Sequence, residues 1–128
     1  MESSLSDKKA IACNCLSQMI AACDNILLWN EDVVDVNDYL SSPMGMQKMA
    51  ASCMLIEGIG EGIKKIDRLL PGFLSEYEPN VEWRNIKGMR DHIAHGYFDI
   101  NEQLVFDVVK NEIEPLRVVL HRLMDILS

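Results

Sequence analysis

Apolar residues recur at intervals of three and four along most of the chain, as expected of helices that bury one face. Ser6 or Asp7 can cap the first of these helices. Its apolar stripe comprises Ala12, Leu16, Met19, Ile20, Cys23, Ile26 and Leu27. The acidic run over residues 30–38 predicts the end of this helix and a solvated connection to the next one.

A second helix is predicted to begin at Ser42–Pro43, with serine as the N-cap and proline at the first helical position. It stops at Pro71–Gly72. Gly58, Gly60 and Gly62 lie inside it, but no strand precedes them, as a dinucleotide-binding fingerprint would require. We therefore expect these glycines to let another helix approach closely, at some cost in helix stability.

Two further helices complete the pattern. One begins near Val81 and ends near Gly96, because glycine is a natural C-terminal stop. Its inward side chains are Trp83, Ile86, Met89, Ile93 and Ala94. The last helix runs from about Gln103 to Leu127, and Pro115 must kink or interrupt it, because proline lacks an N–H and clashes with the preceding turn.

These elements, with no strand period and no repeat, predict an all-α, up-and-down bundle of four to five helices in a single domain over residues 1–128. With 48% hydrophobic but only 6% aromatic residues, its core must be mainly aliphatic. No apolar stretch approaches the roughly 20 residues that span a membrane. The N-terminus is polar and acidic, unlike a signal peptide. We therefore expect a cytoplasmic protein with no membrane association.

The four cysteines predict reduced thiols in the core rather than a metal site. Cys13, Cys15 and Cys23 fall in the first predicted helix and Cys53 in the second. Residues two apart on a helix point about 200° from each other, so Cys13 and Cys15 cannot both bind one metal ion without unwinding it. We expect no bound metal.

The net charge of −8 argues against bulk electrostatic attraction to nucleic acid. It leaves room for a local basic patch, and it suits a protein whose usual partner is another protein. Any function that involves RNA must be reconciled with this charge.

The helix predicted from residue 81 carries an outward polar stripe. At 100° per residue, Arg84, Lys87, Asp91 and His95 fall on one face, opposite the apolar arc. Asp91 precedes His95 by one turn, the separation at which a carboxylate can orient an imidazole. The stripe therefore presents two cations, a carboxylate and an imidazole together.

Arg90 does not share this face, because it lies about 140° from His95 around the wheel. Its guanidinium can reach His95 by side-chain length, by distortion of the helix near Gly96, or across a subunit interface. A two-fold axis would bring two copies of both residues together.

These residue types suit the cleavage of RNA. A ribose 2′-hydroxyl can attack its own phosphate without a metal, given a base, an acid and positive charge on the phosphorane. His95 can act as the acid or the base, and the planar fork of Arg90 matches phosphate oxygens. One imidazole cannot easily fill both proton roles, whereas two from a dimer can. Taken singly, a histidine near a helix end is more often a cap or a surface residue.

The order of the residues adds a further indication. Arg90 and His95 are separated by four residues, Asp91 follows the arginine, and His95–Gly96–Tyr97 follows a His-x-Tyr form. This pattern closely resembles the HepT-like branch of the HEPN superfamily, small helical proteins marked by arginine, four to six residues, and histidine. The resemblance extends from about residue 39 to the end of the chain.

The resemblance implies a HEPN-like fold and a toxin of a type VII toxin–antitoxin pair, a metal-independent ribonuclease that needs no cofactor of its own. It implies a homodimer in which Arg90 and His95 of both subunits line an interfacial cleft. In the resulting hypothesis Asp91 orients the site, Tyr97 positions the substrate, and Arg84 and Lys87 guide RNA. The implied antitoxin is a minimal nucleotidyltransferase that uses ATP to attach AMP to the residue matching Tyr97. AMP there would add bulk and negative charge where phosphate should bind.

Two alternatives remain at this stage. One is a non-catalytic HEPN nucleotide-binding or regulatory subunit of a nucleotidyltransferase, which explains the charge of −8 more comfortably. The other is a purely structural helical dimer, which leaves the polar stripe unexplained. His92 is interpreted as an exposed side chain in preference to a second proton carrier.

Overall fold

The computed structural model describes residues 4–96 and 98–128, and these form eight helices and no strand. They are α1 (Leu5–Trp29), α2 (Asn37–Leu40), α3 (Pro43–Leu69), α4 (Phe73–Tyr77), α5 (Trp83–Lys87), α6 (Met89–Ile93), α7 (Glu102–Asn111) and α8 (Ile113–Leu127). The predicted all-α class is confirmed.

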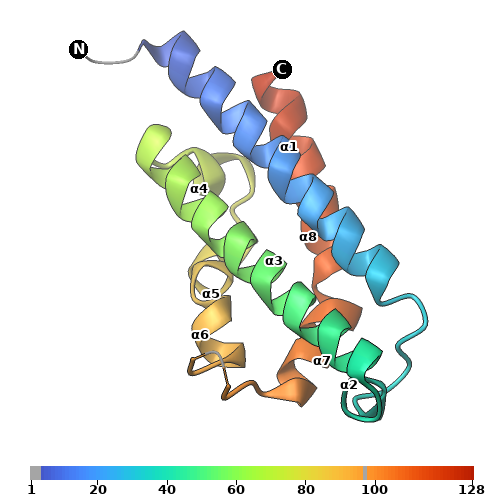
Figure 1. Ribbon diagram of the computed structural model, residues 1–128. Coiled ribbons are helices and arrows are strands. Elements are labelled where there is room, and N and C mark those ends of the chain that lie inside the picture. Colours follow the sequence, from blue (N-terminus) through green and yellow to red (C-terminus); the bar gives the residue numbers. More distant parts are fainter. Residues whose placement is uncertain (1–3, 97) are drawn as a thin grey trace.

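Three long helices form the frame of the bundle (Figure 1). α1 packs against both α3 and α8, so the first and last helices of the chain lie side by side. The shorter helices α5, α6 and α7 pack against α3. The segment that carries the candidate chemistry therefore packs against α3.

The predicted stripe of α1 is the central part of the core. Ala12, Leu16, Met19, Ile20, Cys23 and Ile26 are all buried, and only Leu27 of the predicted set is half-buried. Cys15 joins them, which the sequence pattern did not include. The helix starts earlier than predicted, since Ser4 is its N-cap and its hydroxyl accepts a hydrogen bond from the amide of Asp7 at 3.0 Å.

The start of α3 matches the prediction in detail. The Ser42 hydroxyl accepts a hydrogen bond from the amide of Gly45 at 3.0 Å, and Pro43 is the first helical residue. Two of the three glycines within α3 also lie at close approaches. A Cβ on Gly60 would lie 3.3 Å from the carbonyl oxygen of Ile86, and one on Gly62 would meet the side chain of Met19. Gly58 has open space around it.

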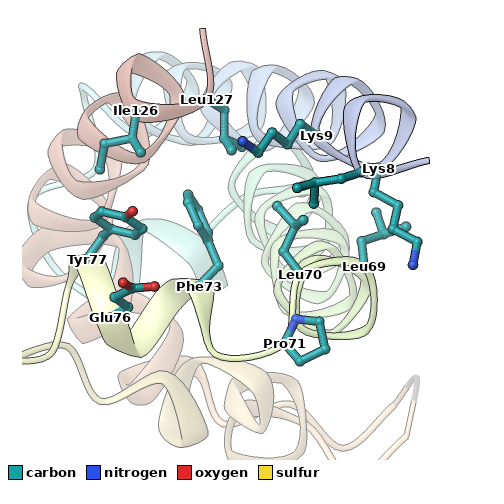
Figure 2. Close-up of a pocket in the computed structure, with 11 residues that line it drawn as sticks. Lys8, Lys9, Leu69, Leu70, Pro71, Phe73, Glu76, Tyr77, Ile126 and Leu127 are labelled. Atoms are coloured by element: carbon teal, nitrogen blue, oxygen red, sulfur yellow. The ribbon is translucent and has the colours of Figure 1, made fainter. Parts of the chain in front are cut away.

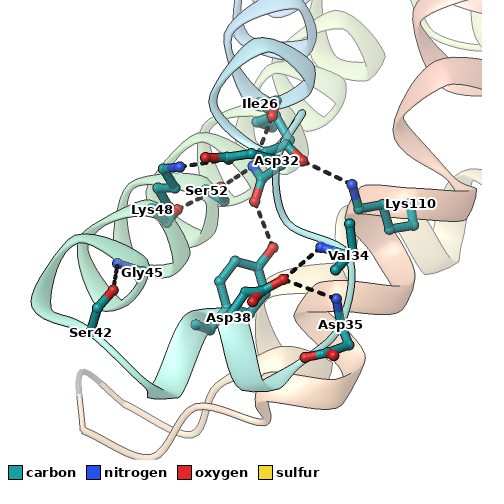
Figure 3. Close-up of polar contacts among 12 residues, drawn as sticks. Ile26, Asp32, Val34, Asp35, Asp38, Ser42, Gly45, Lys48, Ser52 and Lys110 are labelled. Atoms are coloured by element: carbon teal, nitrogen blue, oxygen red, sulfur yellow. Dashed lines mark hydrogen bonds and ion pairs between the residues drawn. The ribbon is translucent and has the colours of Figure 1, made fainter.

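The sequence predicted a solvated connection after α1, but part of this connection is buried. Asn30 is only 1% exposed, and its side-chain amide donates to the carbonyl of Ile26 and to the hydroxyl of Ser52 (Figure 3). The Tyr39 hydroxyl donates to the Asn30 side-chain oxygen at 2.7 Å, and Lys110 donates to the Asn30 carbonyl at 2.8 Å. A buried amide therefore joins α1, α2, α3 and α7, because each of its polar atoms finds a partner.

The last predicted helix is interrupted, as Pro115 requires. α7 ends at Asn111, and α8 begins at Ile113 with Pro115 in its first turn, where a missing N–H costs little. Within the described part of the chain, the two helices are separated by Glu112 alone.

The expectation that no apolar stretch is long enough to span a membrane is wrong for α1. This helix is long and apolar enough to cross a membrane, by length and composition only, with a mean hydropathy of 1.4 over 18 residues. The core helix of a globular bundle passes the same test, and the stripe of α1 is packed against α3 and α8. The isoleucines, leucines, alanines and cysteines between its polar residues raise its hydropathy.

The cysteines are all free. Burial raises the pKa of the Cys23 thiol to about 12 and that of Cys53 to about 11, and it also raises the pKa of Cys15. These three groups are therefore protonated near neutral pH and act as small apolar residues of the core, as expected.

The loop after α4 is tied to α8 by one ion pair, which predicts a pH effect. Arg122 donates two hydrogen bonds to the Glu78 carboxylate, at 2.7 and 3.0 Å, and holds the pKa of this carboxyl below its usual value. The pair therefore stabilises the fold at neutral pH, and this contribution is lost as the pH falls through the lowered pKa. The melting temperature of the wild type should exceed that of Glu78→Gln at pH 7, and the difference between the two should shrink toward pH 3. A difference that grew on acidification would contradict the assignment.

Candidate active site

The helix predicted over residues 81–96 is broken at Gly88, into α5 and α6. The amide of Gly88 donates to the carbonyl of Arg84 and closes α5. Glycine has a low helix propensity, and the carbonyl end of α5 rests against Gly60 of α3. The helical wheel therefore cannot be extended across Gly88, and the predicted stripe is wrong as a continuous face.

The chain also leaves the helix earlier than predicted, at Ile93. Ala94 is extended and forms an antiparallel bridge with Ile100. The amide of His95 donates to the carbonyl of Asp99 at 2.9 Å, and the amide of Asn101 donates to the carbonyl of Ile93 at 2.7 Å. His95 thus lies in a narrow turn pinned at both ends by backbone hydrogen bonds.

Gly96 permits this turn, because its φ of 125° lies in a region that side chains with a Cβ rarely adopt. Distortion of the helix end near Gly96 was one of the three routes by which Arg90 could approach His95. The distortion is present, although no hydrogen bond joins the two side chains in the part of the chain that the structure describes.

Arg90 is half-buried on α6 and lies near two carboxylates. Its guanidinium is 3.9 Å from a carboxylate oxygen of Glu57 on α3 and 3.6 Å from one of Asp91. Both distances exceed that of a good hydrogen bond. Electrostatic attraction therefore orients the guanidinium of Arg90, and its N–H donors remain available to a ligand. Arg90 and Asp91 are therefore brought together as predicted residues of one site.

Lys87 and Arg84 differ in their availability. Lys87 forms an ion pair with Asp67 of α3, so its charge helps to hold α5 in place. Arg84 is exposed, and its side chain makes no ion pair with any residue in the described ranges. Of these two predicted RNA contacts, Arg84 has the cation more freely available to a phosphate.

Asp91 and His95 are not joined as the wheel predicted. Both are exposed, but His95 lies beyond the end of α6, and no hydrogen bond between their side chains occurs in the described chain. The carboxylate of Asp91 faces Arg90 instead. His92 is exposed, as interpreted from the sequence. Tyr97 lies outside the described residues.

Sequence reasoning missed the two carboxylates on α3 that face these cations. Glu57 and Asp67 precede Arg90 and Lys87 by 33 and 20 positions, respectively. Such long-range pairing has no local signature in the sequence.

Among residues 4–96 and 98–128, no group of three histidine, cysteine, aspartate or glutamate side chains is placed to hold a metal ion. A hollow of about 490 Å³ lies elsewhere, lined by Lys8 and Lys9 at the start of α1 and by Phe73, Glu76 and Tyr77 of α4 (Figure 2). It contains none of the predicted site residues. The candidate chemistry is therefore confined to α5, α6 and the turn after α6.

Comparison with known proteins supports the resemblance. The sequence model of the family described as "Ribonuclease HepT-like" matches residues 36–123. The chain belongs to this family. No solved structure matches the chain.

Curated relatives of this HepT-like chain carry ribonuclease names. "Putative RNase TTE0752" of Caldanaerobacter subterraneus subsp. tengcongensis is 30% identical over 65% of this chain and 68% of its own length. "Putative RNase MJ0125" of Methanocaldococcus jannaschii is 29% identical over 87% and 85%, respectively. "Probable ribonuclease HepT" of Thermococcus cleftensis is 32% identical over 48% and 53%. Membership of the family assigns the chain to the ribonucleases.

Proposed function

We propose that this HepT-like protein is a metal-independent endoribonuclease toxin that acts in the cytoplasm as a homodimer. The observation that carries the proposal is the placement of Arg90 on α6 and of His95 in the sharp, hydrogen-bonded turn that follows it, in a chain of the ribonuclease HepT-like family. Both side chains are accessible to solvent at least in part.

In the proposed reaction, His95 takes the proton of the 2′-hydroxyl, whose oxygen attacks the adjacent phosphorus. The P–O bond to the 5′-oxygen breaks, and a second imidazole protonates that oxygen. The products are a 2′,3′-cyclic phosphate and a 5′-hydroxyl. Arg90 stabilises the negative charge of the phosphorane through its two parallel donors, and Asp91 orients that guanidinium.

A dimer is needed because one subunit offers one His95 to two proton transfers. Phe98, three residues beyond His95, is fully exposed. Burying this large apolar side chain against a partner subunit would be favourable, because it removes apolar surface from water. Its location supports a two-fold contact that places the motif turns of both subunits along one cleft.

RNA binding by a chain of charge −8 depends on local positive charge. Arg84 supplies a cation without a nearby intramolecular carboxylate partner in the described chain, and it shortly precedes Arg90 in the same stretch of sequence. Lys87 would contribute only when RNA competes with Asp67. We propose modest, salt-sensitive affinity for RNA as the result.

The proposed antitoxin is a minimal nucleotidyltransferase encoded beside this protein, in a type VII pair. It would transfer AMP from ATP to Tyr97, which follows the glycine of the motif turn. The added phosphate would oppose the phosphate of RNA next to His95. An increase in intact mass confined to the peptide containing Tyr97 would be the signature of this step.

The test of the function is cleavage of RNA by purified protein in the presence of EDTA. Arg90→Ala should lower kcat by about 10²–10³-fold, the effect of removing one donor that stabilises a developing oxyanion. Arg68→Ala is the matched control, because Arg68 is an arginine of α3 with no part in the proposed site.

Equal cleavage by wild type and Arg90→Ala would exclude this mechanism. Binding of nucleotides without any cleavage by the wild type would favour the regulatory-subunit alternative. Product analysis adds a second criterion, since the reaction must leave 2′,3′-cyclic phosphate ends.

A further inference from the structure

A groove of about 570 Å³ lies next to the segment from Arg90 to His95, between α5 and α6 on one side and α7 and α8 on the other. This volume is within the range of sites that hold a small molecule or one part of a larger ligand. His92 and Ile93, which lie between Arg90 and His95 in the sequence, both line it. The groove therefore begins at the helix that carries the candidate arginine.

The floor of the groove is apolar. Its side chains include Ile86 and Met89 from the motif side and Val108 and Leu116 from the opposite side. Aliphatic and thioether walls suit the faces of a flat ring, which loses water favourably when it is buried between them. A sugar or a phosphate would gain little from such walls.

The polar groups of the groove are amides, an imidazole and carboxylates. They belong to Asn85, His92, Asn111, Glu82 and Glu112. No lysine or arginine lines the groove in the described chain. The groove is therefore unsuited to a phosphate and suited to an uncharged group that offers N–H donors.

We propose that this groove binds a nucleobase of the RNA substrate and that it selects bases with an exocyclic amino group over uracil. The proposal rests on the proposed ribonuclease function. Asparagine pairs with the adenine edge through two hydrogen bonds, and a glutamate accepts from the cytosine amino group. Uracil offers carbonyl oxygens in place of the amino group and would face the carboxylates of Glu82 and Glu112 unfavourably.

The position of the groove gives this selection a purpose in cleavage. Arg90 and His92 are two residues apart on α6 and so point about 200° from each other, Arg90 toward Glu57 of α3 and His92 into the groove. In the proposed reaction the phosphate therefore lies on the other side of α6 from the bound base. The base belongs to a neighbouring nucleotide and sets which phosphate of the strand is cut.

The test uses Leu104, which lines the groove from α7 and is 39% exposed, so that Leu104→Trp can fill the mouth without entering the core. Val118→Trp is the matched control, since Val118 is 42% exposed on α8 and does not line the groove. Adenosine, cytidine and uridine are titrated into each protein by NMR. The sites cut in an RNA of random sequence are mapped by sequencing, and sedimentation gives the oligomeric state.

Wild type and Val118→Trp should bind adenosine or cytidine roughly tenfold more tightly than uridine, the scale of losing one good base contact. Leu104→Trp should lose this binding and the base preference of cleavage, while it still cuts RNA. Nucleoside binding with the expected preference but no cleavage would uphold the groove and refute the proposed ribonuclease function.

Three results would overturn the base-binding role. One is equal nucleoside binding by wild type and Leu104→Trp, and another is uridine bound as tightly as adenosine and cytidine. The third is a dimer that dissociates only in Leu104→Trp, because the groove would then be covered by a second copy of the chain.

Discussion

His95→Ala should lower the rate of RNA cleavage by about 10²–10⁴-fold, the usual contribution of a general acid–base group. An imidazole can both take up and give up a proton, and in the proposed dimer its loss removes both proton carriers at once. The backbone of the turn should survive, because the hydrogen bond to Asp99 uses the amide of His95 and not its side chain. The loss is therefore expected in kcat and not in stability.

His121→Ala supplies the comparison for this measurement. The chain has three histidines, and His121 lies on α8 outside the proposed site. Initial rates with a fluorescent RNA, at matched folded fractions, would separate catalysis from unfolding. If His95→Ala cuts RNA as fast as His121→Ala, His95 is not the acid or the base.

Gly45→Ala should destabilise the fold by about 3 kcal/mol, the upper end of the cost of overfilling a packed site. A Cβ on Gly45 would overlap the backbone carbonyl of Asp38, which cannot move away like the end of a flexible side chain. Gly45 is buried in the first turn of α3, where its amide is held by Ser42. Relief of the clash would require α2 and α3 to separate.

Gly58→Ala is the matched comparison for this substitution. Gly58 lies in the same helix, and a Cβ added there would have no neighbouring atom within 4 Å, so alanine should stabilise the helix by about 0.5–1 kcal/mol. Urea unfolding of both variants would measure the two effects. A similar loss in both would mean that contact with Asp38 does not decide the cost at Gly45.

The long helices could be predicted because their periodicity extends over many turns. α1 and α3 show repeated apolar spacing, and the N-cap at Ser42 has a local chemical cause. α2 and α4 were missed, because helices of four and five residues make little more than one turn and leave no period to detect. Their formation depends on packing against α3.

The break at Gly88 was hidden by a pattern that continues across it. Trp83, Met89 and Ile93 are all buried, as predicted, because α5 and α6 both face α3. Apolar spacing indicates which side chains face the core. It does not indicate whether the backbone between them is one continuous helix. The inward residues were therefore right, while the outward stripe that depended on an unbroken helix was wrong.

The chemical identity of the candidate site was accessible from the sequence, but its surroundings were not. The order of Arg90, Asp91 and His95 is local, whereas the carboxylate of Glu57 comes from another helix. The same limit applies to the hydrogen bonds around Asn30, whose partners are spread from Ile26 to Lys110. Contacts between residues so far apart leave no period in one sequence.

The pairing of α1 with α8 has a consequence for the moment at which the protein becomes active. At about 5–20 residues per second, roughly 4–17 s pass between synthesis of the last residue of α1 and of the first residue of α8. During that time the apolar stripe of α1 lacks one of its two long partners, because α8 is made after it. The segment that carries Arg90 and His95 is made within this interval, before the frame of three long helices can close. On the ribosome, the candidate site is therefore complete in sequence before it is complete in structure.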